Sequence, residues 1–285
     1  MAKWRTVELG RMSWEEVAEV IPERPVILLP IGTVEQHGPH LPVNADNMVA
    51  HFVATRAAEQ ANALVAPGIN YGCSAVFRRF PGTIPVRQET LAAVLRDVCE
   101  SLIAQGFRRL VFVDNHGGNE GVCEQVAREL KAAHGIVIGN IYPWNLGYSL
   151  MRDTYEDVAS AYGHGAEPET SAMLAMFPDD VTRERMTAGR YQPFAGWQVQ
   201  SYSKVDVPGQ SVTGTVYLDS DEVAPTGVTG DQRETSAERG RVWIERVVGF
   251  AVDFIRHYDA VTADADWARI PADTGTVAPH RHFDR

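Results

Sequence analysis

Short apolar runs alternate with longer amphipathic segments along most of this chain, and the alternation restricts the folds it can adopt. Residues 26–29 and 109–113 are largely apolar runs of the length of buried strands. Between them, residues 90–104 carry apolar side chains at helical spacing. Strands that are apolar on both faces and separated by helices are typical of parallel sheets with crossover helices. The pattern predicts an α/β fold, a three-layer αβα sandwich with a largely parallel central sheet.

The remaining segments extend this scheme into one domain. We expect a single catalytic domain over 1–262 and a tail over 263–285. Within the domain, 179–229 breaks the alternation with scattered Gly, Pro and Ser, and is predicted to be an irregular pocket or interface segment. Its aromatic residues, suited to an interface, are Phe194, Trp197, Tyr202 and Tyr217. The further predicted helices are 47–61, 120–133, 172–177 and 231–257, and the further strands are 63–66 and 135–142.

Four potential metal ligands crowd the loop that follows the first strand. They are Glu35, His37, His40 and Asp46, and glycines and prolines lie among them. In open α/β sheets, ligands bind beyond the carboxyl ends of the strands. A mixed set of carboxylates and imidazoles suits zinc, manganese or iron, whereas an all-oxygen set suits calcium or magnesium. The loop therefore predicts a transition-metal site, in which we expect His40 to orient the loop.

Two later segments also combine histidine and acidic residues with glycines at the end of a predicted element. Residues 114–120, Asp-Asn-His-Gly-Gly-Asn-Glu, directly follow the strand 109–113 and include His116. Residues 163–171 carry His164 and two glutamates just before an apolar helix. Paired glycines allow the backbone to approach a ligand closely. We expect all three segments to meet in one pocket.

Composition limits the partners and the compartment. A net charge of −11 argues against nucleic acid and anionic membranes as partners. No apolar run approaches the ~20 residues that span a bilayer. Cys73, Cys99 and Cys123 are far apart and are expected to be reduced thiols. We therefore expect a cytoplasmic protein with a small-molecule substrate.

Four segments together resemble the signature sequences of the creatininase (creatinine amidohydrolase) family, in the family's order. They are 32–42, 80–83, 115–119 and 169–171. The resemblance implies a creatininase-like fold, metal-dependent hydrolysis and closed homo-oligomers, typically hexamers. Neither the Trp-Asp pair nor the His-x-Glu element with which creatininase holds its substrate is evident. We therefore expect a member of the family other than creatininase itself.

The resemblance also implies two divalent metal ions per subunit, zinc, manganese or iron, bridged by Asp46. One metal would also take Glu35 and His116, and the other would take His37. The family's remaining ligand is a glutamate at the position of Gly118 in this chain. Relatives with His-Gly-Gly-Asn use an acidic residue of the later segment, for which we prefer Glu169 over Glu167, since Glu-Thr-Ser is the more family-like triplet.

The chemistry implied by the resemblance is hydrolysis by metal-activated water. The family's catalytic histidine matches His164, whose imidazole can move a proton near neutral pH. Glu169 would share the catalytic centre. The alternative for His164 is a structural role, in which it only caps the following helix.

The substrate is the least constrained part of the prediction. Where the family's pocket loop commonly has a histidine soon after Tyr-Gly-x-Ser, this chain has Phe77 and then two arginines. Arg78 could clamp a carboxylate or phosphate, or else be solvated or bridge subunits. Trp144 could form an aromatic lid or belong to the core. The predicted substrate-binding residues are Ser74, Arg78, Asn119 and Trp144.

Three functions remain compatible with these residues. The first is hydrolysis of a small polar, cyclic or formyl amide. The second is hydrolysis of a non-amide ring, such as a dehydro-inositol ketone of the 3-dehydro-scyllo-inosose type. The third is a peptide-trimming or non-catalytic assembly role. The intact set of candidate ligands, together with His164, argues against a non-catalytic scaffold.

Overall fold

Four parallel strands form the central sheet of the computed structural model, which describes residues 3–263. Across the sheet the order is β2 (Ala63–Val65), β1 (Val26–Ile31), β3 (Leu110–Asp114) and β4 (Gly139–Ile141). Every residue of β1 and β3 is buried, as expected for central strands covered on both faces. The predicted α/β fold with a parallel central sheet is confirmed.

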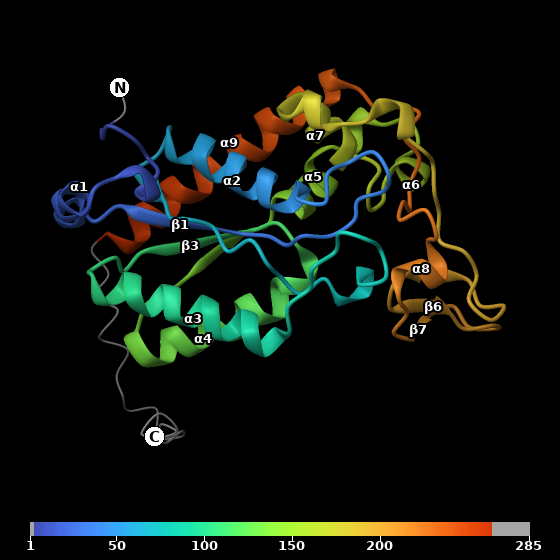
Figure 1. Ribbon diagram of the computed structural model, residues 1–285, viewed down its shortest axis with the longest axis horizontal. Helices are drawn as coiled ribbons and strands as arrows, with labels where there is room; N and C mark the ends of the chain where they lie inside the picture. Colours follow the sequence, from blue (N-terminus) through green and yellow to red (C-terminus); the bar gives the residue numbers. More distant parts are fainter. Residues whose placement is uncertain (1–2, 264–285) are drawn as a thin grey trace.

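Helices cover both faces of this sheet (Figure 1). On one face, the long α9 (Ala237–Thr262) packs against α2 (Ala45–Ala58), α5 (Pro143–Leu150) and α7 (Glu169–Met176). On the other, α3 (Gln88–Ala104) packs against α4 (Glu120–His134). The shorter helices are α1 (Trp14–Val20), α6 (Val158–Ala161) and α8 (Ser220–Val223). Among residues 3–263, no helix is both long enough and apolar enough to span a bilayer.

The starts of α2, α7 and α9 differ from those expected. α2 begins at Ala45 and α7 at Glu169, each slightly earlier than predicted, so Asp46 and Glu169 lie in first helical turns. The N-terminal end of a helix favours negative charge, which suits both carboxylates. α9 begins later than predicted because the Ser236 side chain caps it, accepting a hydrogen bond from the Arg239 amide.

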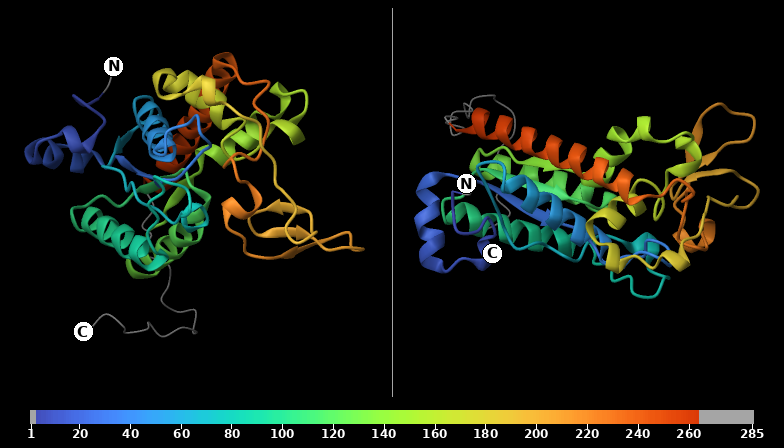
Figure 2. Two further views of the ribbon diagram at one scale, coloured as in Figure 1. Left: turned by 45° about the vertical axis from the view of Figure 1, so that its right-hand side comes forward. Right: turned by 90° about the horizontal axis from the view of Figure 1, so that it is seen from above.

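A small β-rich lobe projects from one end of the αβα body (Figure 2). It contains the antiparallel strands β5 (Val199–Ser201), β6 (Lys204–Asp206) and β7 (Thr213–Thr215), and α8 lies beside them. Its own small core is formed by Val199, Val205, Leu218 and Val223. The lobe lies within residues 179–229, the segment predicted to be irregular. Its strands were not predicted because three residues are too few to show a period-two pattern. Of the predicted tail, residues 264–285 lie outside the described residues.

Candidate metal centre and active site

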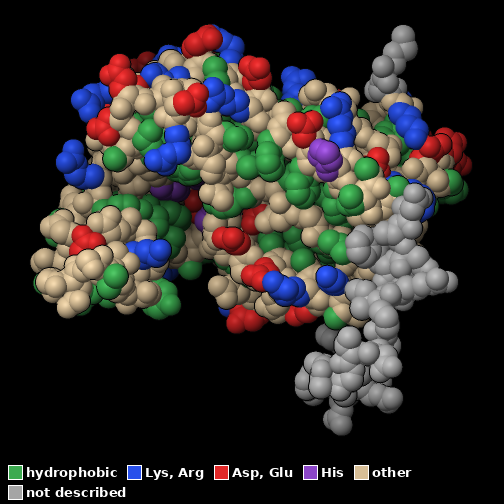
Figure 3. Space-filling view, turned by 180° about the vertical axis from the view of Figure 1, so that it is seen from behind, with side chains coloured by type: hydrophobic (Ala, Val, Ile, Leu, Met, Phe, Trp, Pro, Cys, Tyr) green, Lys and Arg blue, Asp and Glu red, His purple; other side chains and the backbone are tan. Residues whose placement is uncertain are grey.

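A cavity of about 440 Å³ lies beyond the carboxyl ends of β1 and β3. The space-filling view shows a hollow between the lobe and the body, with histidine side chains visible inside it (Figure 3). The three polar segments singled out in the sequence all contribute to the cavity. Their side chains in its lining are Glu35, His37, Asp46, Asn115, His116, His164 and Glu169.

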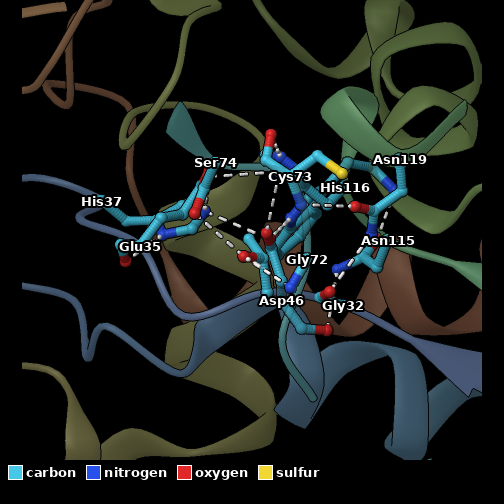
Figure 4. A network of polar contacts seen from close by, with 12 residues as sticks. Gly32, Glu35, His37, Asp46, Gly72, Cys73, Ser74, Asn115, His116 and Asn119 are labelled. Atoms are coloured by element: carbon cyan, nitrogen blue, oxygen red, sulfur yellow. Dashed lines mark hydrogen bonds and ion pairs between the residues drawn. The ribbon is translucent and has the colours of Figure 1, made fainter. Parts of the chain in front are cut away.

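Asp46 lies between two histidines at the centre of this group (Figure 4). Its Oδ1 is 3.2 Å from His37 Nε2, and its Oδ2 is 3.3 Å from His116 Nδ1. Glu35 Oε2 is 3.2 Å from the same nitrogen of His116, and Glu35 Oε1 is 3.8 Å from His37 Nε2. All four side chains are buried. Both carboxylates thus direct one oxygen toward each imidazole, and Asp46 lies within 3.3 Å of both.

Local contacts hold the loops that carry these ligands. The Asn119 side chain donates to Gly32 O and to Asp114 Oδ1, both at 3.1 Å, and its Oδ1 accepts from the Cys73 amide at 2.9 Å. It therefore connects the loops after β1 and β3 with the loop around residue 73 (Figure 4). Gly32 is required by close packing, because a Cβ there would lie 2.3 Å from Asn47 Oδ1.

The electrostatics of the centre are dominated by its buried carboxylates. Burial alone would lower the pKa of His37, but Asp46 and Glu35 outweigh it and raise that pKa to about 10. The pKa of His116 is likewise raised well above its ordinary value, because Glu35 and Asp46 outweigh the effect of burial. The pKa of Asp46 is lowered, because the two imidazoles more than offset its burial.

These residues fit a divalent metal ion. Glu35 Oε2 and Asp46 Oδ2 are buried and have no hydrogen-bond donor among the described residues, although His116 Nδ1 lies beside both. Buried anionic oxygens without partners are costly. A cation at the point where these atoms converge would satisfy both oxygens and the nitrogen. The mixture of carboxylate and imidazole suits zinc, manganese or iron.

A second group of candidate metal ligands lies beside the first. Glu35, His37 and His164 offer ligand atoms within 4.8 Å of one another. Glu169 lines the same cavity, and its two oxygens accept from the Gly165 amide at 2.8 Å and the Tyr148 hydroxyl at 2.9 Å. Burial raises the pKa of Glu169 to about 7.

The family's remaining metal ligand is a glutamate at the position of Gly118, and neither Glu167 nor a side chain at position 118 is placed to supply it here. The carboxylate of Glu167 is hydrogen-bonded by the hydroxyls of Tyr155 and Thr235, and the residue is not among those lining the cavity. A Cβ at Gly118 would lie 2.3 Å from Cys73 O and 2.5 Å from His116 Nε2. A glutamate cannot be accommodated at Gly118 on this backbone, and of the two later glutamates only Glu169 lines the cavity.

His164 is held in one orientation at the edge of the metal ligands. Its ring stacks on Phe77 with centroids 4.5 Å apart and lies 4.5 Å from the His37 ring. Its Nε2 is 2.7 Å from Gln36 O, and a carbonyl oxygen can only accept, so Nε2 carries the hydrogen. Burial lowers the pKa of His164 to about 3. The unprotonated Nδ1 is therefore available to accept a proton.

The predicted substrate-binding residues occupy different places. Trp144 lines the cavity, and its Nε1 donates to Asp46 Oδ1 at 2.8 Å. Ser74 is fully buried against Thr33 Oγ1, and Asn119 connects loops as described above; neither is among the residues lining the cavity. Arg78 also lies outside the lining and forms a bidentate ion pair with Asp219, at 2.7 and 2.5 Å.

Aromatic residues that the sequence analysis did not assign to the site form much of the cavity wall. They are Phe77, Tyr142, Tyr148, Tyr162, Tyr191 and Tyr202. Tyr202, expected at an exposed interface, is half-buried and packs at 5.3 Å from both Phe77 and Tyr191. Isolated tyrosines in loops far apart in sequence carry no local signal of a common site.

Metal affinity at this centre is expected to depend strongly on pH. In the metal-free protein the raised pKa values of His37 and His116 keep both imidazoles protonated at neutral pH, and each must lose its proton to bind a metal. Between about pH 6 and 8 the affinity should therefore rise, about tenfold per pH unit for each displaced proton. Calorimetry with zinc in buffers of different ionisation enthalpy counts the protons released. A pH-independent affinity would contradict this protonation state.

Comparison with known proteins places the chain in a family. The family model described as creatininase, creatinine amidohydrolase, matches residues 10–255. The mycofactocin precursor peptide peptidase of Mycobacterium ulcerans is 30% identical over 276 residues, covering 94% of this chain and 95% of that protein. The creatinine amidohydrolase of Pseudomonas putida is 29% identical, covering 88% and 97%. The 3-dehydro-scyllo-inosose hydrolase of Thermotoga maritima is 23% identical, covering 86% and 81%.

Solved structures agree with this placement. A crystal structure of creatinine amidohydrolase superposes with a TM-score of 0.74 at 27% identity, covering 89% of this chain and 98% of that one. A manganese form of creatininase superposes with a TM-score of 0.71 at 26% identity, with the same coverage. Another similar structure is described as a Zn-Zn type of a creatininase mutant. The chain is therefore a metal-dependent hydrolase of the creatininase family, and a member other than creatininase itself.

Proposed function

We propose that this enzyme hydrolyses an amide at two divalent metal ions, both contacted by Asp46. Glu35 and His116 would complete one position, and His37 and Glu169 the other. The observation that carries the proposal is the buried Asp46 carboxylate between two imidazoles, with unsatisfied oxygens on Asp46 and Glu35. A divalent cation would satisfy these oxygens directly.

The other side chains of the cavity have roles that follow from their contacts. When bound, a metal pair of this kind polarises a carbonyl and lowers the pKa of water. His164 accepts a proton at Nδ1 and returns it to the leaving nitrogen, while its Nε2 remains bonded to Gln36 O. Trp144 holds the Asp46 carboxylate through its Nε1. Tyr148 and the Gly165 amide orient Glu169.

The bond type is better supported than the substrate itself. We propose a small amide, cyclic or formyl, and peptide trimming is the second candidate. The relative named a peptide peptidase favours the second, since the similarity covers 94% of this chain at 30% identity. Hydrolysis of a dehydro-inositol ketone is a further alternative, represented by a relative at 23% identity.

Removal and restoration of metal tests the proposed hydrolysis. Protein stripped with a chelator should turn over neither a formyl amide, a cyclic amide nor a short peptide. Zinc or manganese should restore turnover of at least one of them, at about two metals per chain by elemental analysis. Hydrolysis that persists without metal, or saturation at one metal per chain, would contradict the two-metal proposal.

We also propose that the chain forms a closed homo-oligomer, a hexamer, in the cytoplasm. Partly exposed Phe194 and Trp197 and the largely exposed Tyr217 support an interface near the lobe, and closed symmetry is the usual form of homo-oligomers. The three cysteines are free thiols, which fits a reducing compartment. Light scattering at micromolar concentration should give about six times the chain mass of 31.4 kDa. A monomeric mass would refute the assembly.

A further inference from the structure

We propose that the substrate carries an uncharged, planar group beside the scissile carbonyl, and that Phe77, Tyr191 and Tyr202 bind this group. These three residues are called the aromatic wall below. The inference deepens the proposed function and rests on it, because it concerns the substrate of the same site. The residues that line the cavity then distinguish the candidate substrates by the charge and shape of the group that they can bind.

The aromatic wall is a built surface assembled from distant parts of the chain. Phe77 ends the short 3-10 helix Ala75–Phe77, and Tyr202 lies between β5 and β6. The Tyr202 ring packs edge-to-face at 5.3 Å from both Phe77 and Tyr191. Tyr191 and Tyr202 also pack on the small core of the lobe, which holds them in place. Ring surface that remains open to a cavity can pair with an aromatic group of a ligand.

More aromatic surface completes the lining. Tyr148 and Tyr162, which also line the cavity, pack edge-to-face at 5.3 Å. The hydroxyl oxygens of Tyr162 and Tyr202 are shielded from solvent, so these residues present ring surface to the cavity. A cavity of about 440 Å³ has room for a single ring or a small amide.

An anionic group would meet no lysine or arginine among the described residues of the lining. The nearby arginines of the loop are already paired: Arg78 with Asp219 at 2.7 and 2.5 Å, and Arg79 with Asp221 at 3.1 Å. A substrate carboxylate or phosphate would meet carboxylates and rings there, and its burial without a partner would be costly.

Several polar groups of the lining are already hydrogen-bonded within the protein and are less free to bind a polyol ring, although the hydroxyls of Tyr162 and Tyr202 have no such partner among the described residues. Asn115 Oδ1 accepts from the Trp144 amide at 2.9 Å, and Thr229 Oγ1 accepts from the His164 amide at 2.8 Å. Both oxygens of Glu169 already have donors. Each buried hydroxyl of a polyol without a partner would weaken binding. The lining therefore favours a flat, uncharged group.

Binding of hydroxamates to the zinc-loaded protein tests this inference without requiring turnover. The hydroxamate group binds the metal in every member of the series, and only its substituent varies. Calorimetry would compare phenylacetohydroxamate with acetohydroxamate, the monohydroxamate of succinate and a polyol hydroxamate. We expect the phenyl compound to bind at least about tenfold more tightly than the other three. Equal or tighter binding of the anionic or polyol compound would overturn the inference.

Two matched variants locate the preference. Tyr202→Leu keeps an apolar side chain but removes the ring, and should reduce the advantage of phenylacetohydroxamate over acetohydroxamate by about threefold or more. Tyr71→Leu changes an exposed tyrosine outside the lining and should leave that advantage unchanged. An unchanged advantage in Tyr202→Leu would contradict the role of the wall. If that variant does not fold, the wild-type series still decides between the substituents.

The two proposals fail in different ways. If the protein prefers the phenyl compound but hydrolyses no amide, the proposed function is refuted, and the proposal that the aromatic wall binds a planar group stands. An active hydrolase without this preference would refute the wall alone.

Discussion

Replacing Asp46 with alanine is expected to remove both metals and reduce turnover to background. Its carboxylate is the only one that lies within 3.3 Å of both imidazoles among the described residues, one oxygen toward each. His37→Ala should instead retain about one metal per chain, because Glu35, Asp46 and His116 remain. Elemental analysis of the purified variants measures the difference.

Two further variants separate the causes of that loss. Asp46→Asn keeps the size of the side chain and can still accept from Trp144 Nε1, so metal lost in this variant reports the missing charge. Asp179→Ala removes an exposed carboxylate and should keep full metal content and activity. If Asp46→Ala retained two metals per chain, the bridging assignment would be wrong.

Replacing His164 with alanine is expected to lower turnover by about 10²–10⁴-fold while metal content stays normal. Burial lowers the pKa of His164 to about 3, so the ring is neutral at pH 7 and its Nδ1 carries no proton at the start of the reaction. Removing it deletes proton transfer, whereas the ligands Glu35, Asp46 and His116 are untouched. Single-turnover kinetics on any surrogate amide, with parallel metal analysis, measures both quantities.

Glu169→Gln provides the contrasting result. If Glu169 supplies the ligand absent at Gly118, this variant should lose the second metal together with activity, while its hydrogen bonds to Tyr148 and Gly165 can largely persist. Metal loss in His164→Ala would instead make His164 a ligand, as its proximity to Glu35 and His37 allows. Full activity in His164→Ala would refute its proposed role in proton transfer.

The sequence alone determined the fold class and the place where the candidate metal ligands gather. The short apolar runs at 26–29 and 110–113 have the length and the branched side chains of strands buried on both faces, a signal that lies within each segment. The ligands of each loop are close together in sequence and directly follow a strand. Because parallel strands end at the same edge, their convergence could be anticipated.

Tertiary structure decided which side chains face the cavity. Glu167 and Glu169 are two residues apart, yet one is hydrogen-bonded by Tyr155 and Thr235 and the other lines the cavity. Arg78 is held by Asp219, a partner 141 residues away.

The aromatic wall likewise depends on the lobe packing against the loop that carries Phe77. Which side chains face the cavity is decided by long-range packing and by competition for hydrogen-bond partners. Neither leaves a periodic or local pattern in the chain, so only the folded structure could reveal them.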